Sequence, residues 1–330
     1  MPRVLITGAT GFLGGYLVQE LVEDYEVHAL GRNLIRGREL EEEGSIFHQA
    51  DFTNYLQCQP HFTNIDYVIH AGALSTVWGK FEDFYRANVF GTEIVADLCL
   101  EHGIKRLVYV SSPSVYSAKE DRLDLRENQV DSSNDLNYYI ETKIRAEATL
   151  RRYQEKGLEV VILRPRGLIG IGDTSVVPRL LRANAKIGIP LLNHGQNLVD
   201  ITCVENVAYA CRLAMETPDI AGQIFNITNG EPMEFRTILE MFLQAIGEQP
   251  RYLKLPTSWL YQASIAFEKI YNSLALTDEP PLTKYMVCTL GYSQTLDITK
   301  AREVLGYQAR KSLTEGIRDY GKWWQESKKC

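Results

Sequence analysis

Short apolar runs alternate, along the first half of the chain, with stretches in which apolar residues recur every three or four positions. The runs are rich in β-branched residues, which favours buried strands, and they lie at 3–7, 26–30, 66–73, 106–112 and 159–165. The stretches with helical spacing lie at 12–23, 84–102 and 138–156. Strands that alternate with helices predict an α/β fold, with a parallel sheet covered by helices on both faces.

The regular alternation ends after Pro165, where a glycine-rich loop begins. Beyond this loop the pattern predicts a helix over 176–188, a short strand and a helix within 198–217, and a strand over 222–228. From 230 onward we expect a smaller, mostly helical region. The chain therefore predicts a first unit, 1–170 plus about 198–229, and a smaller interleaved α/β unit for the substrate, about 171–197 plus 230–330.

Three glycines in "ITGATGFLGG" separate the first predicted strand from the first predicted helix. Gly8, Gly11 and Gly14 suit a tight turn, a close approach of the backbone to a pyrophosphate, and close packing of helix on strand. The free N–H groups at the start of the helix attract phosphate. In this strand–loop–helix context the motif predicts dinucleotide binding by a Rossmann-type, doubly wound sheet.

The GxxGxxG spacing resembles that of the short-chain dehydrogenase/reductase superfamily, in its extended branch with the epimerase/dehydratase fold. "ADFT" and "HAGA" also lie where members of that branch contact the cofactor. The resemblance implies that Asp51 and Phe52 hold the adenine and that Ala71, Gly72 and Ala73 line the path of the dinucleotide.

The resemblance also assigns Asn88, in "YRANVFGT", to the cofactor or to a structural role, and a loop or helix cap is the competing interpretation. The full set of cofactor contacts that it implies is Gly8, Thr10, Gly11, Phe12, Leu13, Gly14, Arg32, Asp51, Phe52, Ala71, Gly72, Ala73, Asn88, Tyr139, Lys143 and Pro165.

The end of the second predicted strand, "ALGRN", bears on the choice of cofactor. An acidic residue at this place binds the ribose 2′-hydroxyl of NAD(H) and excludes a 2′-phosphate. Gly31 stands there instead and Arg32 follows it, and an arginine can pair bidentately with phosphate. We therefore favour NADP(H), with Arg36 and Arg38 assisting, and keep NAD(H) as the alternative. An ordinary surface arginine is the competing interpretation of Arg32.

The segment "NYYIETK" holds two tyrosines and a lysine within seven residues. Residues four apart share one face of a helix, so Tyr139 pairs with Lys143 while Tyr138 points elsewhere. A nearby cation lowers the pKa of a phenol from about 10, which makes Tyr139 a candidate general acid and base. Tyr138 is left with packing or with the rim of the substrate site.

A serine at the end of the predicted strand over 106–112 is a candidate partner for Tyr139 at the substrate oxygen. Ser112 lies in "VSSPSVY", at the carboxyl edge of the sheet, where a hydroxyl can polarise a substrate oxygen. In the family that the chain resembles, the catalytic Ser or Thr precedes by four residues the tyrosine of an "SSxxVY"-like motif, here Tyr116. The predicted catalytic set is therefore Ser112, Tyr139 and Lys143.

Longer segments resemble the 3β-hydroxysteroid dehydrogenase-type branch, among them "LRPRGLIGIGD", "VDITCVENVAYA" and "FNITNGEP". They also resemble bacterial NADPH-dependent reductases that act on 2-alkyl-3-ketoalkanoates. The resemblance implies exchange of a secondary alcohol and a ketone on a hydrophobic substrate, either steroid-like or 3-keto acyl. It places Pro165 at the nicotinamide end, and its substrate-side candidates are Ser75, Thr76, Trp78, Ser114 and Arg166.

Two other functions stay open at this stage. A nucleotide-sugar epimerase or dehydratase has the same triad but retains NAD, and Arg179, Arg182 and Lys186 are available for its nucleotide. Gly31 and Arg32 argue against NAD. A non-catalytic, NADP-sensing regulator is the third option, but such proteins often lack the tyrosine or the lysine that this chain keeps.

Composition excludes several other classes. The formal net charge of −7 gives no support to nucleic-acid binding, and six cysteines without metal-ligand spacing predict free thiols in a reducing cytoplasm and no metal. We expect no leader and no transmembrane segment. The stretch 258–276 predicts an amphipathic core helix or, alternatively, a cover for a lipophilic pocket or a peripheral membrane contact. Related enzymes imply a homodimer through the helices near 84–102 and 138–156.

Overall fold

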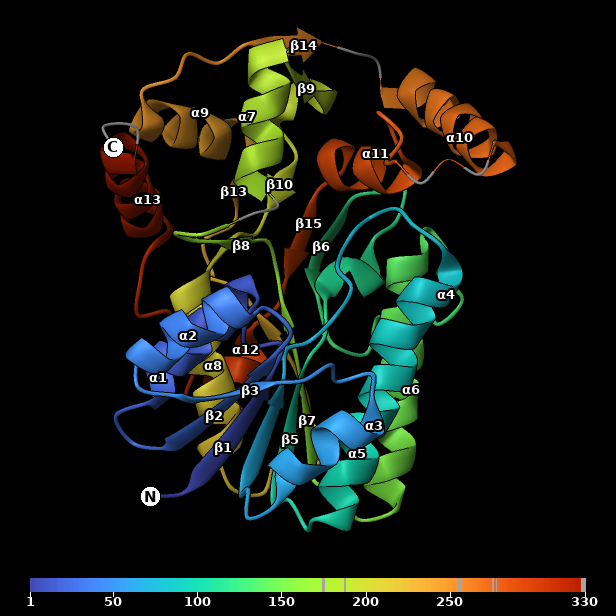
Figure 1. Ribbon diagram of the computed structural model, residues 1–330. Coiled ribbons are helices and arrows are strands. Elements are labelled where there is room, and N and C mark those ends of the chain that lie inside the picture. Colours follow the sequence, from blue (N-terminus) through green and yellow to red (C-terminus); the bar gives the residue numbers. More distant parts are fainter. Residues whose placement is uncertain (174–175, 187, 255–256, 275, 277, 328–330) are drawn as a thin grey trace.

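The computed structural model describes residues 1–173, 176–186, 188–254, 257–274, 276 and 278–327 (Figure 1). Its centre is a parallel seven-stranded sheet in the order β12-β7-β5-β4-β1-β2-β3. The strands are β1 Arg3–Thr7, β2 Glu26–Gly31, β3 Ile46–Gln49, β4 Tyr67–His70, β5 Arg106–Val110, β7 Val160–Pro165 and β12 Ile224–Ile227. The predicted α/β class with a doubly wound parallel sheet is confirmed.

The strand order reverses at β1, which pairs with β2 on one side and β4 on the other. Val4 lies opposite Val27 of β2 and opposite Tyr67 of β4. In open sheets of this kind, ligands bind outside the carboxyl ends of the strands beside such a reversal. The glycine loop that follows β1 therefore lies at the expected ligand edge.

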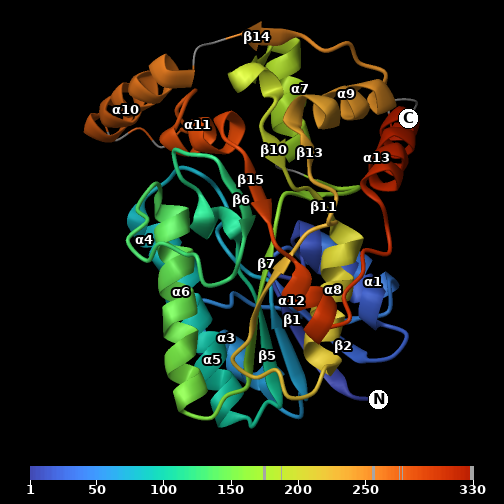
Figure 2. The ribbon, with the colours of Figure 1, turned by 180° about the vertical axis from the view of Figure 1, so that it is seen from behind.

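Helices cover both faces of this sheet, as Figures 1 and 2 show from opposite sides. One face carries α1 Phe12–Leu21, α2 Leu34–Glu42, α8 Val204–Glu216 and α12 Thr299–Val304. The other carries α3 Tyr55–Cys58, α5 Gly91–Glu101 and α6 Tyr138–Glu155. Because side chains alternate along a strand, Val4 and Ile6 enter the core under α1 while Leu5 enters the core under α5 and α6.

A smaller unit lies beyond the carboxyl ends of the main sheet (Figure 1). Its helices are α7 Val176–Lys186, α9 Phe235–Ile246, α10 Thr257–Ser273, α11 Lys284–Gly291 and α13 Leu313–Ser327. Its short strands, with those that connect it to the main sheet, are β6 Arg122–Leu125, β8 Leu168–Ile169, β9 Ile189–Leu191, β10 Leu198–Val199, β11 Thr202–Cys203, β13 Met233–Glu234, β14 Tyr252–Lys254 and β15 Gln294–Leu296. A separate hydrophobic core joins α9 to α13 through Leu239, Phe242 and Tyr320.

The chain passes between the two units more than once. After α8, β12 returns to the main sheet beside β7, with Phe225 opposite Leu163. Further along, Ala301 and Tyr307 pack into the core under α1 and α8. The exact unit boundaries stay a prediction, and this packing favours adding residues 298–307 to the larger unit.

Four segments, among others, differ from their sequence-based expectation. The predicted helix over 84–102 is divided into α4 Phe81–Phe84, a π-helical stretch Tyr85–Phe90, and α5. The predicted strand over 106–112 ends at Val110, because Ser112 caps the 3-10 turn η3, Pro113–Tyr116. Strands β3 and β6 were not predicted, since both are short and half of β6 and the ends of β3 are exposed.

Helix α10 is not an ordinary core helix. It packs against α11, yet Trp259 is 79% exposed and Ile270 52%, and Leu274 just after the helix is 64% exposed. Of the segments considered above, Thr174, Ser175, Ile187, Ala275 and Cys330 lie outside the described residues.

Candidate functional site

The glycine loop after β1 closes against its neighbours without room for side chains. Gly8 has a φ of +74°, and a Cβ on it would lie 2.6 Å from the Gly72 Cα. A Cβ on Gly14 would lie 2.2 Å from the Ala9 carbonyl oxygen. Gly11 begins α1 without a side-chain cap, so the first N–H groups of the helix stay available to a ligand. This cradle fits a dinucleotide pyrophosphate.

Phe52 and Asp51 shape the loop that follows β3. The Phe52 ring fills the space over two glycines, because a Cβ on Gly72 would lie 2.7 Å from it and one on Gly91 2.6 Å. The Asp51 carboxylate accepts hydrogen bonds from the Thr53 N–H and hydroxyl, both at 2.9 Å. The assignment of Asp51 and Phe52 to the adenine stays a prediction. The cofactor contacts expected for Thr10, Phe12, Leu13, Ala71 and Ala73 also stay predictions.

Asn88 anchors a loop and does not cap a helix. It is 1% exposed and stands in the π-helical stretch. Its Oδ1 accepts from the Leu74 N–H at 2.8 Å, and its Nδ2 donates to the Leu74 carbonyl and to the Thr142 hydroxyl. These bonds tie the loop after β4 to α6, and π-helical turns often occur at functional sites.

Arg32 leaves the end of β2 with 76% of its side chain exposed and forms a long ion pair, 3.8 Å, with Asp51. The preceding Gly31 is crowded, because a Cβ there would lie 2.6 Å from the Thr10 side chain. An acidic side chain at this position would therefore require Thr10 to move. The exposed Arg32 side chain is compatible with a nearby phosphate. The space at Gly31 leaves little room for an acidic side chain, which would repel such a phosphate.

Arg36 is already engaged. Its guanidinium pairs with Glu39 at 2.7 Å and with Glu43 at 3.4 Å, while Arg38 is exposed on α2. Of these three arginines, Arg36 is therefore the one held by close ion pairs, and a role of Arg32 or Arg38 toward a 2′-phosphate stays a prediction.

Ser112 lies at the carboxyl end of β5, between the sheet and α6. Its Oγ accepts from the Ser114 N–H at 3.2 Å and lies 2.8 Å from the Ser114 Oγ. Ser114 is 4% exposed whereas Ser112 is half-buried, so Ser112 presents the more accessible hydroxyl. The motif tyrosine, Tyr116, is turned away and donates to Asn226 Oδ1 at 2.9 Å.

The two tyrosines at the start of α6 diverge, as their spacing predicts. Tyr138 is 43% exposed and its ring packs edge-on to Phe81, with 5.4 Å between centroids. Tyr139 is turned inward and half-buried. Burial raises the pKa of Tyr139 to about 12, and hydrogen bonding with Ser112 offsets part of that rise. Ser112 and Tyr139 therefore lie together.

Lys143 is 1% exposed and turns toward the sheet. Its ammonium donates to the Tyr109 hydroxyl and to the Val110 carbonyl oxygen, both at 2.8 Å. Burial lowers the pKa of Lys143 to about 7, against an opposing effect of Glu147. A direct lowering of the Tyr139 pKa by Lys143 was expected, but among the described residues the shift arises from burial, Ser112 and Tyr285. The shared helical face does not bring the ammonium onto the phenol, because Lys143 reaches inward.

One turn further along α6, Glu147 binds a buried arginine that the sequence analysis did not select. Arg164 is 0% exposed, and its Nε and one terminal nitrogen donate to the two Glu147 oxygens at 2.9 and 2.5 Å. Ser111 donates to the same carboxylate at 2.5 Å, and Arg164 also binds the Tyr116 hydroxyl. Two signals pointed to this network: a glutamate four residues after Lys143, and an arginine inside an apolar strand.

The substrate-side candidates lie in three places: the loop after β4, the η3 turn with Ser114 described above, and the position just after β7. Ser75 and Thr76 are exposed, and the Thr76 hydroxyl donates to the Trp78 carbonyl at 3.1 Å. Trp78 donates through Nε1 to the Leu276 carbonyl at 3.4 Å and packs edge-on to Tyr271 of α10. This loop therefore contacts the end of the α10 region.

Pro165 ends β7 opposite Ile227, at the same carboxyl edge as Ser112. Arg166 follows it and is 7% exposed. Both residues lie at this sheet edge, and their contacts with the nicotinamide end and the substrate stay predictions.

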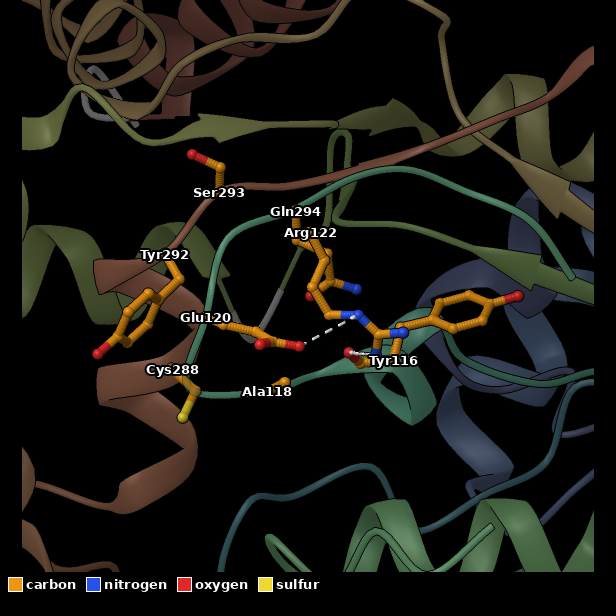
Figure 3. A pocket seen from close by; sticks show the side chains of 8 residues that line it. All are labelled: Tyr116, Ala118, Glu120, Arg122, Cys288, Tyr292, Ser293 and Gln294. Atoms are coloured by element: carbon orange, nitrogen blue, oxygen red, sulfur yellow. Dashed lines mark hydrogen bonds and ion pairs between the residues drawn. The ribbon is translucent and has the colours of Figure 1, made fainter. Parts of the chain in front are cut away.

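A shallow hollow, open to solvent, lies between the η3–β6 segment and the α11–β15 segment (Figure 3). It is lined by Tyr116, Ala118, Glu120, Arg122, Cys288, Tyr292, Ser293 and Gln294. The predicted catalytic residues Ser112, Tyr139 and Lys143 are not part of this lining. The hollow is therefore separate from the candidate active site.

Within the described ranges, no group of three or more His, Cys, Asp or Glu side chains is arranged to hold a metal ion. The same part of the chain has no helix that is both long and apolar enough to cross a membrane. Its cysteines, Cys58, Cys99, Cys203, Cys211 and Cys288, are buried free thiols.

Comparison with known proteins places this geometry in a family. Residues 4–228 match the model of the "NAD dependent epimerase/dehydratase family". A 2-alkyl-3-oxoalkanoate reductase of Stenotrophomonas maltophilia is 33% identical, over 96% of this chain and 97% of that protein. The decarboxylating sterol-4-alpha-carboxylate 3-dehydrogenase of Mus musculus is 29% identical, over 96% of this chain and 89% of its own.

A solved structure, MoeE5 in complex with UDP-glucuronic acid and NAD, superimposes with a TM-score of 0.77 at 26% identity. The superposition covers 98% of this chain and 99% of that one. With a glycine loop that fits a dinucleotide and a family model that matches most of its length, the chain belongs to the NAD-dependent epimerase/dehydratase family, the extended short-chain dehydrogenases/reductases.

Proposed function

We propose that this protein is an NADP(H)-dependent oxidoreductase that interconverts a secondary alcohol and a ketone on a hydrophobic substrate. The observation that carries the proposal is the position of Ser112 beside Tyr139 at the carboxyl edge of the sheet, with Lys143 buried one turn further along α6. Relatives that span nearly the whole chain are named as a 3-oxoalkanoate reductase and a sterol 3-dehydrogenase.

Tyr139 serves as the proton donor and acceptor at the substrate oxygen. A bound nicotinamide supplies a hydride to the carbonyl carbon, or takes one from the alcohol carbon. In reduction, the Tyr139 hydroxyl gives its proton to the oxygen and becomes a phenolate; in oxidation it takes that proton back. With a pKa of about 12, the phenol is fully protonated at neutral pH and ready for the reductive direction.

Ser112 and Lys143 support this proton transfer. The Ser112 hydroxyl donates a hydrogen bond to the substrate oxygen, and the Ser114 N–H holds the Ser112 oxygen in place. The Lys143 ammonium, fixed by Tyr109 and Val110, supplies a positive charge in the buried region behind Tyr139, and from there it is also expected to hold the nicotinamide ribose. A cation in this low-dielectric region favours the phenolate that forms during reduction.

The preference for NADP(H) rests on Arg32 and on the crowded Gly31. A fluorescence titration of the purified protein with NADPH and with NADH tests it, followed by a turnover assay on a panel of ketones and sterols. We expect tighter binding of NADPH and reduction of at least one hydrophobic ketone. Tighter binding of NADH would contradict the cofactor assignment, and binding without any turnover would favour the NADP-sensing regulator.

A nucleotide-sugar epimerase is the alternative that the MoeE5 complex with UDP-glucuronic acid supports. An epimerase retains its NAD between turnovers, so the cofactor purifies with the protein and does not exchange. Absorbance and mass spectrometry of the freshly purified, denatured protein distinguish the two functions. Stoichiometric NAD would favour the epimerase, and exchangeable NADP(H) would favour the ketoreductase.

We also propose a cytoplasmic homodimer that forms through the π-helical stretch, α5 and α6. Tyr85 and Phe90 expose 39% and 46% of their surface on this side, which suits an apolar contact between two copies. Light scattering on the eluted protein measures the mass directly, and a monomer at micromolar concentration would contradict the proposal.

A further inference from the structure

Three polar side chains form a row across neighbouring strands near the carboxyl end of the main sheet. Thr7 of β1 is in register with His70 of β4, and His70 is in register with Tyr109 of β5. Residues in register on parallel strands point to the same face, here the one covered by α5 and α6. All three are 0% exposed. Buried polar groups require hydrogen-bond partners, and the partners of this row lead to Lys143.

The His70 imidazole is hydrogen-bonded through both of its nitrogens. Thr7 Oγ1 lies 2.5 Å from Nδ1, and Thr92 Oγ1 of α5 lies 3.0 Å from Nε2. The Thr92 hydroxyl gives its own proton to the Asn88 carbonyl at 2.7 Å, so it can only accept from His70. The ring proton is therefore on Nε2. Burial lowers the pKa of His70 to about 3, so the ring is neutral and Nδ1 accepts from Thr7.

Tyr109 connects His70 and Thr92 to Lys143. The Tyr109 ring packs against the His70 ring, with 5.6 Å between centroids and 32° between planes. Its hydroxyl forms a hydrogen bond with Thr92 and accepts another from the Lys143 ammonium at 2.8 Å. The imidazole beside the ring and the threonine at the oxygen therefore both restrain the atom that binds the ammonium.

The two acceptors of Lys143 determine the direction of its remaining donor. An ammonium carries three N–H groups, and within the described ranges two of them are bound by the Tyr109 hydroxyl and the Val110 carbonyl oxygen. Lys143 is 1% exposed, so bulk water does not readily replace either acceptor. Fixing two of the three N–H groups leaves the third with a defined direction for a ligand.

We propose that His70 and Thr92 are positioning residues for Lys143, acting through the Tyr109 hydroxyl to direct the third N–H of the ammonium toward the nicotinamide ribose. The inference rests on the role of Lys143 in the oxidoreductase function proposed above. It gives a role to the first residue of "HAGA", whose other three residues are assigned to the path of the dinucleotide. A buried histidine that only stabilises the fold would also have two partners, so a decisive measurement reports on Lys143 and not on stability.

Cofactor affinity reports on Lys143 without any turnover. Fluorescence titration with NADPH and with NADH gives dissociation constants, which a partial loss of folded protein does not change. We expect Tyr109→Phe to raise both constants roughly tenfold, the lower end of what a hydrogen bond to a charged group contributes. Thr92→Val and His70→Phe act through Tyr109 and should raise both about 3- to 10-fold. The factor should be the same for both cofactors, because both contain the nicotinamide ribose.

Matched variants separate hydrogen bonding from packing. Thr92→Ser keeps the hydroxyl that Thr92→Val removes, so its dissociation constants should stay within about twofold of those of the wild type. Thr149→Val is the control for loss of a buried threonine hydroxyl elsewhere. Thr149 is 3% exposed, and its hydroxyl accepts from Arg152 of the same helix, α6. This variant should change neither constant.

The direction of the hydrogen bonds can be measured separately. In protein with isotope-labelled histidine, NMR should show the His70 ring neutral and protonated at Nε2 between about pH 8 and 5. The loss of its signals in His70→Phe identifies them. A ring protonated at Nδ1, or a charged ring, would contradict the direction of the bonds and overturn the inference.

Turnover separates this inference from the function on which it rests. At saturating NADPH, Tyr109→Phe and Thr92→Val should lower kcat for ketone reduction about 3- to 10-fold, while the KM of the ketone stays within about twofold. The expected losses of cofactor affinity in a protein that reduces no ketone would leave the positioning role standing and refute the oxidoreductase function. Unchanged dissociation constants in Thr92→Val and His70→Phe, an equal loss in Thr92→Ser, or a loss confined to NADPH would overturn the inference while the function stands.

Discussion

The Arg164 guanidinium and the Glu147 carboxylate form a two-point ion pair that is almost completely removed from water, with side-chain exposures of 0% and 5%. It connects β7 to α6, the helix that carries Tyr139 and Lys143. Both charges have further partners, Ser111 on the glutamate and Tyr116 on the arginine. Removing one partner of such a buried ion pair leaves an unpaired charge and costs much more free energy than replacing both partners by apolar residues.

Breaking this pair from one side should destabilise the fold strongly. We expect Glu147→Leu or Arg164→Met to lower the free energy of unfolding by about 3–5 kcal/mol, and the double replacement to cost much less than the sum. Urea denaturation measures the three values. The exposed pair of Arg236 and Glu240 is the control, and Arg236→Met should cost no more than about 1 kcal/mol. Additive losses in the double variant would contradict the coupling.

Local patterns were enough to predict the sheet, the glycine loop and the divergence of Tyr138 from Tyr139. Each depends on spacing along a few consecutive residues, which sets the face of a strand or helix. The direction of Lys143 depends instead on Tyr109 and Val110, which come from another element. No local pattern encodes that contact, and the effect of Lys143 on the Tyr139 phenol stays a prediction.

The buried network escaped the sequence analysis for a similar reason. Arg164 and Glu147 are seventeen positions apart, and their pairing follows only once α6 lies on β7. The π-helical stretch that carries Asn88 is also a tertiary feature, because its polar contacts are with Leu74 and Thr142. Residue types at the site were therefore predictable, whereas the partners that orient them were not.

Removing the Tyr139 hydroxyl should abolish proton transfer and spare the cofactor. Tyr139→Phe keeps the ring in its half-buried position and is expected to lower kcat at least about 10²-fold, the usual contribution of a positioned acid. NADPH affinity, measured by fluorescence, should stay within about twofold. Tyr138→Phe is the matched control and should keep its activity, since Tyr138 packs on Phe81. Full activity of Tyr139→Phe would refute the assignment.

The charge of Lys143 should give the enzyme an alkaline limit. Its pKa is lowered to about 7, so the ammonium is present below this pH and lost above it. We expect kcat/KM for ketone reduction to fall as the pH rises through about 7. Glu147 raises this pKa, so Glu147→Gln should move the limb to lower pH, whereas Glu155→Gln at the exposed far end of α6 should not. If the fall of kcat/KM with pH did not move in Glu147→Gln, that fall would not report the titration of Lys143.

Reversing the charge at Arg32 should change the choice of cofactor. Arg32→Glu places a carboxylate where a 2′-phosphate is expected, and we predict a loss of NADPH affinity of about 1.5–3 kcal/mol, with NADH affinity retained or improved. Fluorescence titration measures both affinities. Arg151→Glu, at an exposed position of α6 outside the predicted cofactor site, controls for the general effect of charge. Equal losses of NADPH and NADH in Arg32→Glu would mean that Arg32 does not read the 2′-phosphate.

A column of histidines at the edge of the sheet should make the fold sensitive to acid. The His48 ring stacks between His28 and His61, with centroids 5.2 and 4.2 Å away, and His28 also contacts Glu26. Burial lowers the pKa of His48 to about 4, and its two histidine neighbours add to the effect. The folded protein therefore resists protonation of His48, whereas the unfolded chain takes up the proton near pH 6.5.

The direction of the pH effect on the free energy of unfolding depends on whether the folded or the unfolded chain binds the proton more tightly. Between about pH 6.5 and 4 the unfolded chain binds more protons at this position, so the free energy of unfolding should fall as the pH falls through that window. Because His48 is partly exposed to solvent, we expect a loss of about 1–2 kcal/mol rather than the full value of the shift. Urea denaturation at pH 7 and pH 4.5 measures it. His48→Gln should reduce the difference between the two pH values by that amount, while His194→Asn, at an exposed position, should not. An identical pH dependence in His48→Gln and the wild type would show that the histidine column does not sense acid.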